Sequence, residues 1–302
     1  MANSTRSRRP TPGRPRARPS RRRRPAPRVL RRRRVIVGVV GILLAGLVVL
    51  AIVPLAGLVS AWNAETRRQA IDLTTFDPGT LISDADFYDL NALSAGEIQD
   101  FLDAQVGECR NDSCLAVLRT TLPPRGPIVS DATGETVCEG YDGGELTAAE
   151  IIDRIQRACG ISAKVLLVTL QKEQSLVAGR TARAPEPREL GAAMGARCPD
   201  DAACDTGAEG FAAQVAQGAT DLKSYSASDF MRQPGTHYIA YSPDAACGGS
   251  DVTITNEATA ALYNYTPYQP NAAALAARWG TGDGCSAYGN RNFALYWALW
   301  FG

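Results

Sequence analysis

Histidine is nearly missing from this chain of 302 residues, since His237 alone carries an imidazole. Eight cysteines are present, but no two of them stand in a C-x-x-C spacing. Protein zinc sites are built from clustered cysteine and histidine ligands. The sequence therefore argues against a zinc centre, and we expect neither a metal nor a cofactor. His237 falls in a segment of alternating polarity, where we expect a surface residue of a strand rather than a catalytic base.

The beginning of the chain contains no acidic residue, and the stretch that follows it contains no charged residue of either sign. Residues 1–34 hold fifteen arginines and no acidic residue, and residues 35–64 hold no charged residue at all. An uncharged run of this length exceeds the ~20 residues that cross a bilayer. We therefore predict one transmembrane helix over 35–62. The arginine-rich tail before it is expected in the cytoplasm, because basic residues favour that side of the membrane.

Two other interpretations of this N-terminal region stay open. A basic tract can bind nucleic acid, but this one adjoins an apolar span and contains six prolines. We favour a disordered, solvated tail and expect no nucleic-acid partner. The second alternative is a cleaved signal peptide, because residues 59–61 resemble a cleavage site, although the apolar region is longer than usual for such a peptide. We expect a single-pass protein of the cell membrane, with its C-terminal domain outside the cytoplasm.

The cysteines agree with an extracytoplasmic domain, because all eight follow the apolar span. An even number of cysteines outside the cytoplasm predicts four disulfides. Eight cysteines allow 105 connectivities, so the sequence leaves the pairing open. Consecutive pairing closes short and feasible loops, and gives Cys109–Cys114, Cys138–Cys159, Cys198–Cys204 and Cys247–Cys285.

The residues after the span divide into a stalk over 63–86 and a domain over 87–302, which is large enough to bury one core. Two capping boxes, Ser94 with Glu97 and Thr147 with Glu150, each precede an apolar-periodic run and predict helix starts. Further helices are predicted over 162–178, 209–225, 257–264, 271–279 and 292–301, with a β-hairpin formed by 237–242 and 251–256 and a loop over 120–144. The pattern is that of a mainly α (α+β) domain with a small β-hairpin.

Glu173 lies within the segment 162–178, which is strongly apolar and contains neither glycine nor proline. Ser162 is suited to cap its start. On a helical wheel of about 100° per residue, Leu166 and Leu170 lie within about 60° of Glu173, whereas Lys172 points elsewhere. A carboxyl on an apolar face is costly unless it is paired or protonated. Glu173 is therefore either a general acid or a structural residue satisfied by a neighbouring arginine or by backbone N–H groups.

Three landmarks follow one another along the chain: the helix that carries Glu173, the sequence GAAMG at 191–195, and ALYNYTP at 261–267, with Trp279 further on. In this order they resemble the lysozyme-like lytic transglycosylases, whose corresponding motifs are G-A-x-G-L-M-Q and A-x-Y-N-A-G-P. In this chain no glutamine follows Met194 as the first of these motifs would require. The outer region also resembles a group of cysteine-rich secreted bacterial proteins that carry V-L-L-V-x-L-Q-K-E-Q and A-Y-G-N-R-N-F.

The resemblance implies a lysozyme-like helical domain, here preceded by a transmembrane helix, that cleaves the glycan strands of peptidoglycan. Glu173 would protonate the leaving oxygen, Tyr263 and Asn264 would line the site, and Met194 would pack under the glycan. Tyr265 is suited to stack on a sugar or to fill the core.

Glycosidases normally use two carboxyl groups. If a second one acts here, Asp200, or its neighbour Asp201, is our candidate, although we prefer to interpret this stretch as a disulfide-closed turn at 198–204. The alternative function is a non-catalytic, adhesin-like module that binds the cell wall. In both cases we expect peptidoglycan and the cytoplasmic membrane as partners, and the oligomeric state stays open.

Overall fold

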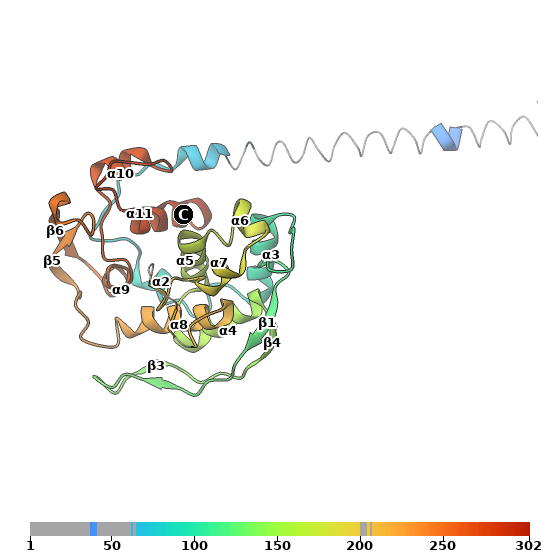
Figure 1. Cartoon of the computed structure of the whole chain (residues 1–302), viewed down its shortest axis with the longest axis horizontal. Coiled ribbons are helices and arrows are strands. Elements are labelled where there is room, and N and C mark those ends of the chain that lie inside the picture. The colour runs from blue at the N-terminus through green and yellow to red at the C-terminus, as the bar shows by residue number, and fades with distance from the viewer. Residues whose placement is uncertain (1–36, 41–61, 63–64, 200–203, 206) are drawn as a thin grey trace, which may run out of the picture. The chain divides into compact units, whose positions relative to one another are not determined.

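The structure is a computed structural model, and it describes residues 37–40, 62, 65–199, 204–205 and 207–302. The chain divides into two compact units, Met1–Glu65 and Thr66–Gly302. The predicted arginine-rich tail, nearly all of the predicted span over 35–62 and the candidate carboxylates Asp200 and Asp201 lie outside the described residues. Residues 66–86, predicted as a stalk, belong to the second unit, which is shown in Figure 1.

The second unit consists of helices and short strands in a mixed order. The helices are α2 (Asp84–Phe87), α3 (Ala95–Val106), α4 (Ala148–Cys159), α5 (Ala163–Gln174), α6 (Arg180–Arg183), α7 (Pro187–Gly191), α8 (Phe211–Ser224), the 3-10 turn η1 (Ala245–Cys247), α9 (Glu257–Tyr265), α10 (Ala272–Ala277) and α11 (Gly289–Trp300). The strands are β1 (Arg119–Leu122), β2 (Ile128–Val129), β3 (Thr136–Cys138), β4 (Gly144–Thr147), β5 (Gly235–Ala240) and β6 (Gly249–Ile254).

Helix α5 lies at the centre of the domain (Figure 1) and packs against α4 and α11, while α4 in turn packs against α3 and α8. Its apolar residues surround the helix instead of forming one stripe, which is the pattern of a helix buried on all sides. Residues on every face are buried, from Val165 and Leu166 to Leu170. Each fully buried leucine or valine contributes about 1.5–3 kcal/mol to folding, so this helix anchors the core.

Both predicted capping boxes are confirmed. The Ser94 hydroxyl accepts from the Glu97 N–H, and the Glu97 carboxylate accepts from the Ser94 N–H at 2.8 Å. The Thr147–Glu150 pair repeats this arrangement at the start of α4. These contacts are local in sequence, which is why the sequence pattern was sufficient to find them.

The predicted cap at Ser162 is wrong in its mechanism. Ser162 stands at the N-cap position of α5, but its hydroxyl makes no capping bond and is buried without a partner among the described residues. The Ala163 N–H is instead accepted by Gln156 Oε1 at 3.0 Å, from the last turns of α4. A buried glutamine of the neighbouring helix α4 therefore takes the place of the local cap. No sequence pattern predicts such a contact between two helices.

The fold class predicted from the sequence requires correction. The described residues form three separate two-stranded antiparallel sheets, β1–β4, β2–β3 and β5–β6, where one hairpin was expected. The β5–β6 hairpin is close to the predicted one and pairs Tyr238 with Asp251. The segment 120–144 was predicted as a loop because of its glycines and prolines, yet it supplies β2, β3 and parts of β1 and β4. Strand pairs this short are decided by tertiary contacts rather than by composition.

A transmembrane helix also formed part of the predicted fold class. Within the residues that the structure describes, no helix is both long enough and apolar enough to cross a membrane. Because the described residues form three small sheets in place of one hairpin, the expected mainly α, lysozyme-like domain with one hairpin is not the one observed. What the structure supports is a helix-rich domain with three small sheets.

All four predicted disulfides are confirmed, with the consecutive pairing. No cysteine is left free. Cys138–Cys159 joins strand β3 to the end of α4 inside the main core, and Cys247–Cys285 joins the β5–β6 loop to the segment before α11. These cross-links hold short and weakly paired elements onto the helical core.

Candidate active site around Glu173

The last turn of α5 carries Glu173, because the helix ends one residue later, at Gln174. Ser175 adopts a left-handed conformation with φ of 55° and closes the helix. The side chain of Gln171 fixes the following turn, since its Oε1 accepts from the N–H groups of Val177 and Ala178 at 3.0 and 2.7 Å. The helix thus ends four residues earlier than predicted, which moves Glu173 from a helix interior to a helix end.

The carboxylate of Glu173 is 28% exposed and forms an ion pair with Lys172, whose own side chain is 2% exposed. Lys172 Nζ donates to Glu173 Oε1 and, at 3.0 Å, to Thr266 Oγ1. The ammonium also lies 5.2 Å from the centre of the Tyr265 ring. The prediction that Lys172 points away from the Glu173 carboxylate is therefore wrong. Long side chains at a helix end bend around it, which a helical wheel does not represent.

The second carboxylate oxygen, Oε2, faces the turn at Gly195. A methyl group placed on Gly195 would lie 3.4 Å from Oε2, and Gly195 has a φ of 68°, which favours glycine. Among the described residues no hydrogen bond to Oε2 is formed. One oxygen of Glu173 is therefore held by Lys172, and the other has no hydrogen-bond partner among the described residues.

A buried glutamine holds the turn beside Glu173. Gln214 Oε1, from α8, accepts from the N–H groups of Met194 and Ala196 at 3.1 and 3.2 Å. Its Nε2 donates to the carbonyls of Ala196 and Ala208 at 2.8 and 2.6 Å. The sequence analysis missed Gln214, although a fully apolar-looking helix face with one glutamine was a usable signal. No glutamine follows Met194 directly in the sequence, but Gln214 of α8 hydrogen-bonds to the same turn.

Tyr265, in the last turn of α9, connects the third landmark to the same place. Its hydroxyl donates to the Met194 carbonyl. Burial of the phenol raises its pKa well above the ordinary value, and the negative charge of Glu173 adds to this. Three segments that are far apart in sequence, at 173, 194–195 and 265–266, therefore meet at one carboxylate.

The other predicted site residues lie elsewhere or serve the fold. Tyr263 is fully buried, and its hydroxyl donates to the Pro78 carbonyl at 3.0 Å. Met194 is also fully buried, against Gly218 of α8. The Asn264 side chain accepts from the Arg232 N–H and donates to the Arg232 carbonyl, and so holds the segment before β5. All three side chains were expected at the substrate. Tyr263 and Met194 are instead buried in the core, and Asn264 is hydrogen-bonded to the backbone of Arg232.

A carboxylate that the sequence analysis did not single out, Asp221 of α8, lies on the far side of the Met194 turn. It accepts from Gln217 Nε2 at 2.8 Å and pairs with Arg197 at 3.5 Å. Burial raises its pKa, while Gln217 and Arg197 act in the opposite direction. The negative charges of Glu173 and Asp221 both act to raise the pKa of the Tyr265 phenol, after the larger effect of its burial.

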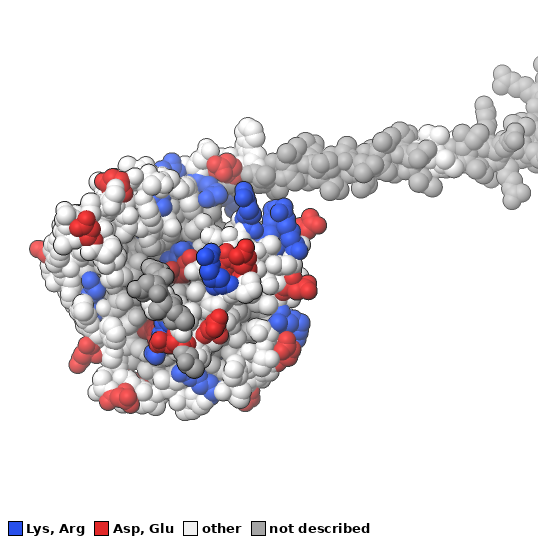
Figure 2. Space-filling view, viewed as in Figure 1, with Lys and Arg blue, Asp and Glu red and all other residues white. Residues whose placement is uncertain are grey.

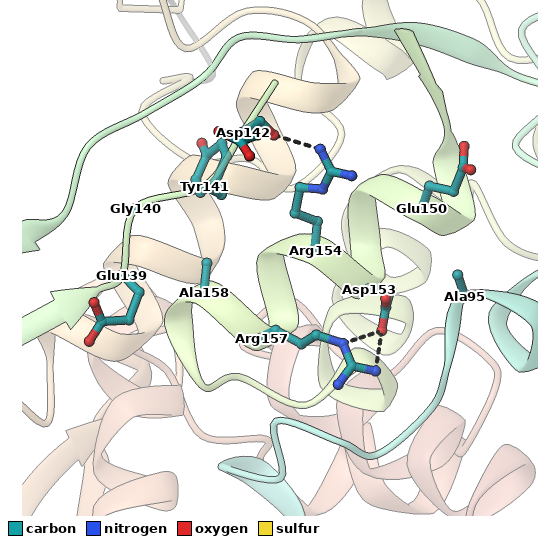
Figure 3. A pocket seen from close by; sticks show the side chains of 10 residues that line it. All are labelled: Ala95, Glu139, Gly140, Tyr141, Asp142, Glu150, Asp153, Arg154, Arg157 and Ala158. Atoms are coloured by element: carbon teal, nitrogen blue, oxygen red, sulfur yellow. Dashed lines mark hydrogen bonds and ion pairs between the residues drawn. The ribbon is translucent and has the colours of Figure 1, made fainter. Parts of the chain in front are cut away.

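Two surface cavities are formed by described residues, and Glu173 lines neither of them. The first has a volume of 480 Å³ and is bordered by α4 and the β3–β4 loop (Figure 3). Its arginines are already engaged, because Arg154 donates to the Asp142 carbonyl and Arg157 pairs with Asp153. The second has a volume of 350 Å³ and lies between α8 and the β1–β2 loop.

Charged side chains of both signs are interspersed over the face of the domain shown in Figure 2, without a large basic patch that would suit a nucleic acid. Among the described residues no cluster of three or more metal-ligating side chains is found.

Comparison with protein-family models, with curated proteins and with solved structures finds no match for this chain. The case for function therefore rests on the arrangement of its own residues.

Proposed function

We propose that the domain cleaves the glycan strands of peptidoglycan, with Glu173 as the proton donor. The observation that carries this proposal is the convergence of three separate segments on the Glu173 carboxylate, whose side chain is partly exposed while that of its partner Lys172 is buried. The same three segments carry the likeness to lytic transglycosylases. A single partly exposed carboxyl, held in a fixed orientation, is the group that such a reaction needs.

The geometry assigns different roles to the two carboxylate oxygens. Oε1 stays on the Lys172 ammonium, so the transferable proton is carried by Oε2, on the Gly195 side. After Oε2 protonates the glycosidic oxygen, the carboxylate that remains is stabilised by the ammonium. The glycosidic C–O bond breaks, and either water or a hydroxyl group of the same sugar completes the reaction.

We also propose that the domain works outside the cytoplasm. Four disulfides and no free cysteine are typical of proteins in oxidising compartments. This location is where the wall polymer is found. Protease added to intact cells should degrade the domain, and survival of the domain under conditions that digest known surface proteins would contradict the proposed location.

The test is mass analysis of the products that the purified full-length chain releases from purified wall. Hydrolysis adds one water to each product, whereas transglycosylation forms an internal ether and leaves the mass without that water. Glu173→Gln should reduce product formation by about 10²–10⁴-fold, as is typical when a general acid is lost. Glu186→Gln, an exposed substitution in the loop before α7, serves as the control and should not change it. Unchanged turnover in Glu173→Gln would overturn the assignment.

A second function, a non-catalytic module that binds the wall, is favoured by two observations. Glu173 has a buried cation as its partner, and Tyr263, which was expected at the substrate, is closed inside the core. A carboxylate fixed by an ammonium is also a way to satisfy a polar group at a helix end. Binding to insoluble wall without any released product, in the wild type as in Glu173→Gln, would establish this function instead.

A further inference from the structure

The sequence AYGNRNF at 287–293 takes no part in the reaction proposed for Glu173. It leads into α11 and forms its first turn, and α11 packs against α5 (Figure 1). Two polar side chains of this sequence, Asn290 and Arg291, are only 1% and 4% exposed. Buried polar groups are nearly always hydrogen-bonded, so the partners of these two residues show what the sequence holds in place.

Arg291 and Tyr288 anchor the start of α11 to the loop that follows α10. The Arg291 guanidinium donates to the Gly280 carbonyl at 2.7 Å, and its central carbon lies 4.2 Å from the centre of the Tyr288 ring. The Tyr288 hydroxyl accepts from the Gly282 N–H at 3.0 Å. The disulfide Cys247–Cys285 joins the residues just before α11 to the β5–β6 loop. The start of α11 is therefore fixed on this side.

Gly289 and Asn290 contact the residue that follows α9, Thr266. Asn290 Nδ2 donates to the carbonyls of Thr266 and Tyr268, at 2.9 and 3.0 Å, and so holds the backbone on both sides of Pro267. Gly289 packs against the Thr266 side chain, because a Cβ added at Gly289 would lie 2.3 Å from Thr266 Cγ2. The backbone of Gly289 does not have a positive φ. The glycine is therefore explained by the space that Thr266 occupies.

Thr266 connects this contact to the proposed catalytic pair. Its Oγ1 accepts from Lys172 Nζ at 3.0 Å, and the same ammonium donates to Glu173 Oε1. Among the described residues, these are the two oxygens to which the ammonium donates. The Lys172 side chain is 2% exposed, so water has little access to replace a lost partner. The Thr266 hydroxyl thus helps to fix where the ammonium lies.

The methyl group and the hydroxyl of Thr266 cannot move independently of each other. Both are bonded to Cβ, so a rotation of χ1 that moves Cγ2 away from Gly289 also moves Oγ1 away from Lys172. A β-branched side chain has few alternative rotamers with which to avoid this. The space that Gly289 leaves for the methyl group therefore determines where the hydroxyl lies.

We propose that Gly289 positions the Lys172–Glu173 pair through Thr266, whose backbone Asn290 holds in place. Gly289 and Thr266 are positioning residues, because they act on the ammonium and not on the glycosidic bond. The proposal deepens the proposed function and rests on it for the consequence in catalysis, since the ammonium holds one oxygen of the proton-donating carboxyl. The position of the ammonium itself can be measured without a substrate.

The test measures the position of the Lys172 side chain directly. The chain contains three lysines, so NMR of the purified full-length protein with ¹³C at lysine alone gives three ε-methylene signals. The Lys172 signal depends on where the side chain lies, because Nζ is 5.2 Å from the centre of the Tyr265 ring and the ring current changes with distance. The signal that is lost in Lys172→Met is that of Lys172.

Gly289→Ala introduces a methyl group that displaces Thr266. The Lys172 signal should therefore shift, and product release from purified wall should fall about tenfold or more, the loss expected when a hydrogen bond to a charged group is broken. Thr266→Ser removes Cγ2 and keeps the hydroxyl, and the remaining atoms of residue 266 lie 3.6 Å from the added carbon, an ordinary contact. The double variant should regain the wild-type signal and product release. An effect of alanine on α11 alone would not be reversed in this way.

Thr266→Val keeps the shape of the side chain and removes the hydroxyl. It should shift the Lys172 signal and reduce product release, and it decides the question if Gly289→Ala does not fold. Thr220→Val is the matched control, because the Thr220 hydroxyl donates to the Ala216 carbonyl within α8. This control should leave the Lys172 signal and product release as in the wild type. Melting temperatures establish which variants are folded.

Two outcomes overturn the proposal. One is an unchanged Lys172 signal in folded Gly289→Ala or in folded Thr266→Val, and the other is a shift that persists in the double variant. The signal is measured without wall, so it does not depend on glycan cleavage. If the wild type releases no product, the proposed function fails, while the NMR signals still decide whether Gly289 positions the pair.

Discussion

Lys172 Nζ donates to Glu173 Oε1 although the two residues are neighbours in α5, where side chains normally diverge. The contact is made at the end of the helix, where Ser175 ends α5 and the C-terminal segment of α9 approaches. Thr266 and the ring of Tyr265 complete the surroundings of the ammonium. The pair is the main difference between the site inferred from the helical wheel and the site in the structure.

Lys172→Met is expected to lower the rate of glycan cleavage. The ammonium donates to Glu173 Oε1, so its removal takes away the group that orients the carboxyl and that would stabilise the carboxylate left after proton transfer. Lys164→Met removes a lysine from the first turn of the same helix, where it lies over Phe301, and should leave product formation from purified wall unchanged. Equal product formation by Lys172→Met and the wild type would refute the role of the pair.

Gln214→Leu should be among the most destabilising single substitutions in α8. It leaves the N–H groups of Met194 and Ala196 and two carbonyls without their buried partner. Because each unsatisfied buried group costs about 1–3 kcal/mol, the free energy of unfolding should fall by about 3 kcal/mol or more. Gln217→Leu, one turn later, breaks a single bond to Asp221 and should cost less than about 1.5 kcal/mol. Urea denaturation of both variants measures the difference.

Asp221→Asn should stabilise the protein at neutral pH, and less so in acid. Burial raises the pKa of Asp221 in the folded state above its ordinary value, so the folded state holds this proton more tightly than the unfolded chain does. The resulting stabilisation is complete below the unfolded pKa and is lost as the pH rises through the folded one. Because asparagine does not ionise, the variant does not lose this stabilisation at higher pH. Its melting temperature should exceed that of the wild type more at pH 7 than at pH 3.5, and an equal difference at both pH values would contradict the prediction.

The disulfides should differ in their contribution to stability. Cys138–Cys159 spans 21 residues and Cys109–Cys114 spans 5, so removal of the first should cost about 1 kcal/mol more on the loop-entropy argument. Replacing each pair by alanines and comparing thermal unfolding tests this order. Thiol labelling of the unreduced, denatured protein should detect no free cysteine, and labelling of two or more would contradict the observed pairing.

The sequence by itself determined the features that depend on local rules. The capping boxes at Ser94 and Thr147 involve residues three positions apart, so their geometry follows from backbone constraints alone. The number of disulfides followed from the even number of cysteines, and the consecutive pairing, which the sequence favoured but left open, is the one observed. The β5–β6 hairpin followed from alternating polarity in two adjacent segments.

Tertiary structure alone decided how the candidate site is arranged. Gln156 and Gln214 act on turns of other segments, and a glutamine's role in such a contact depends on where another helix passes. Tyr263 and Met194 were assigned to the substrate, but close packing with Pro78 and Gly218 buries them. The Lys172–Glu173 pair likewise required the approach of α9 and the early end of α5. Side chains at a junction of several segments take the partners that packing brings to them, and one-dimensional periodicity contains no information about which segments meet.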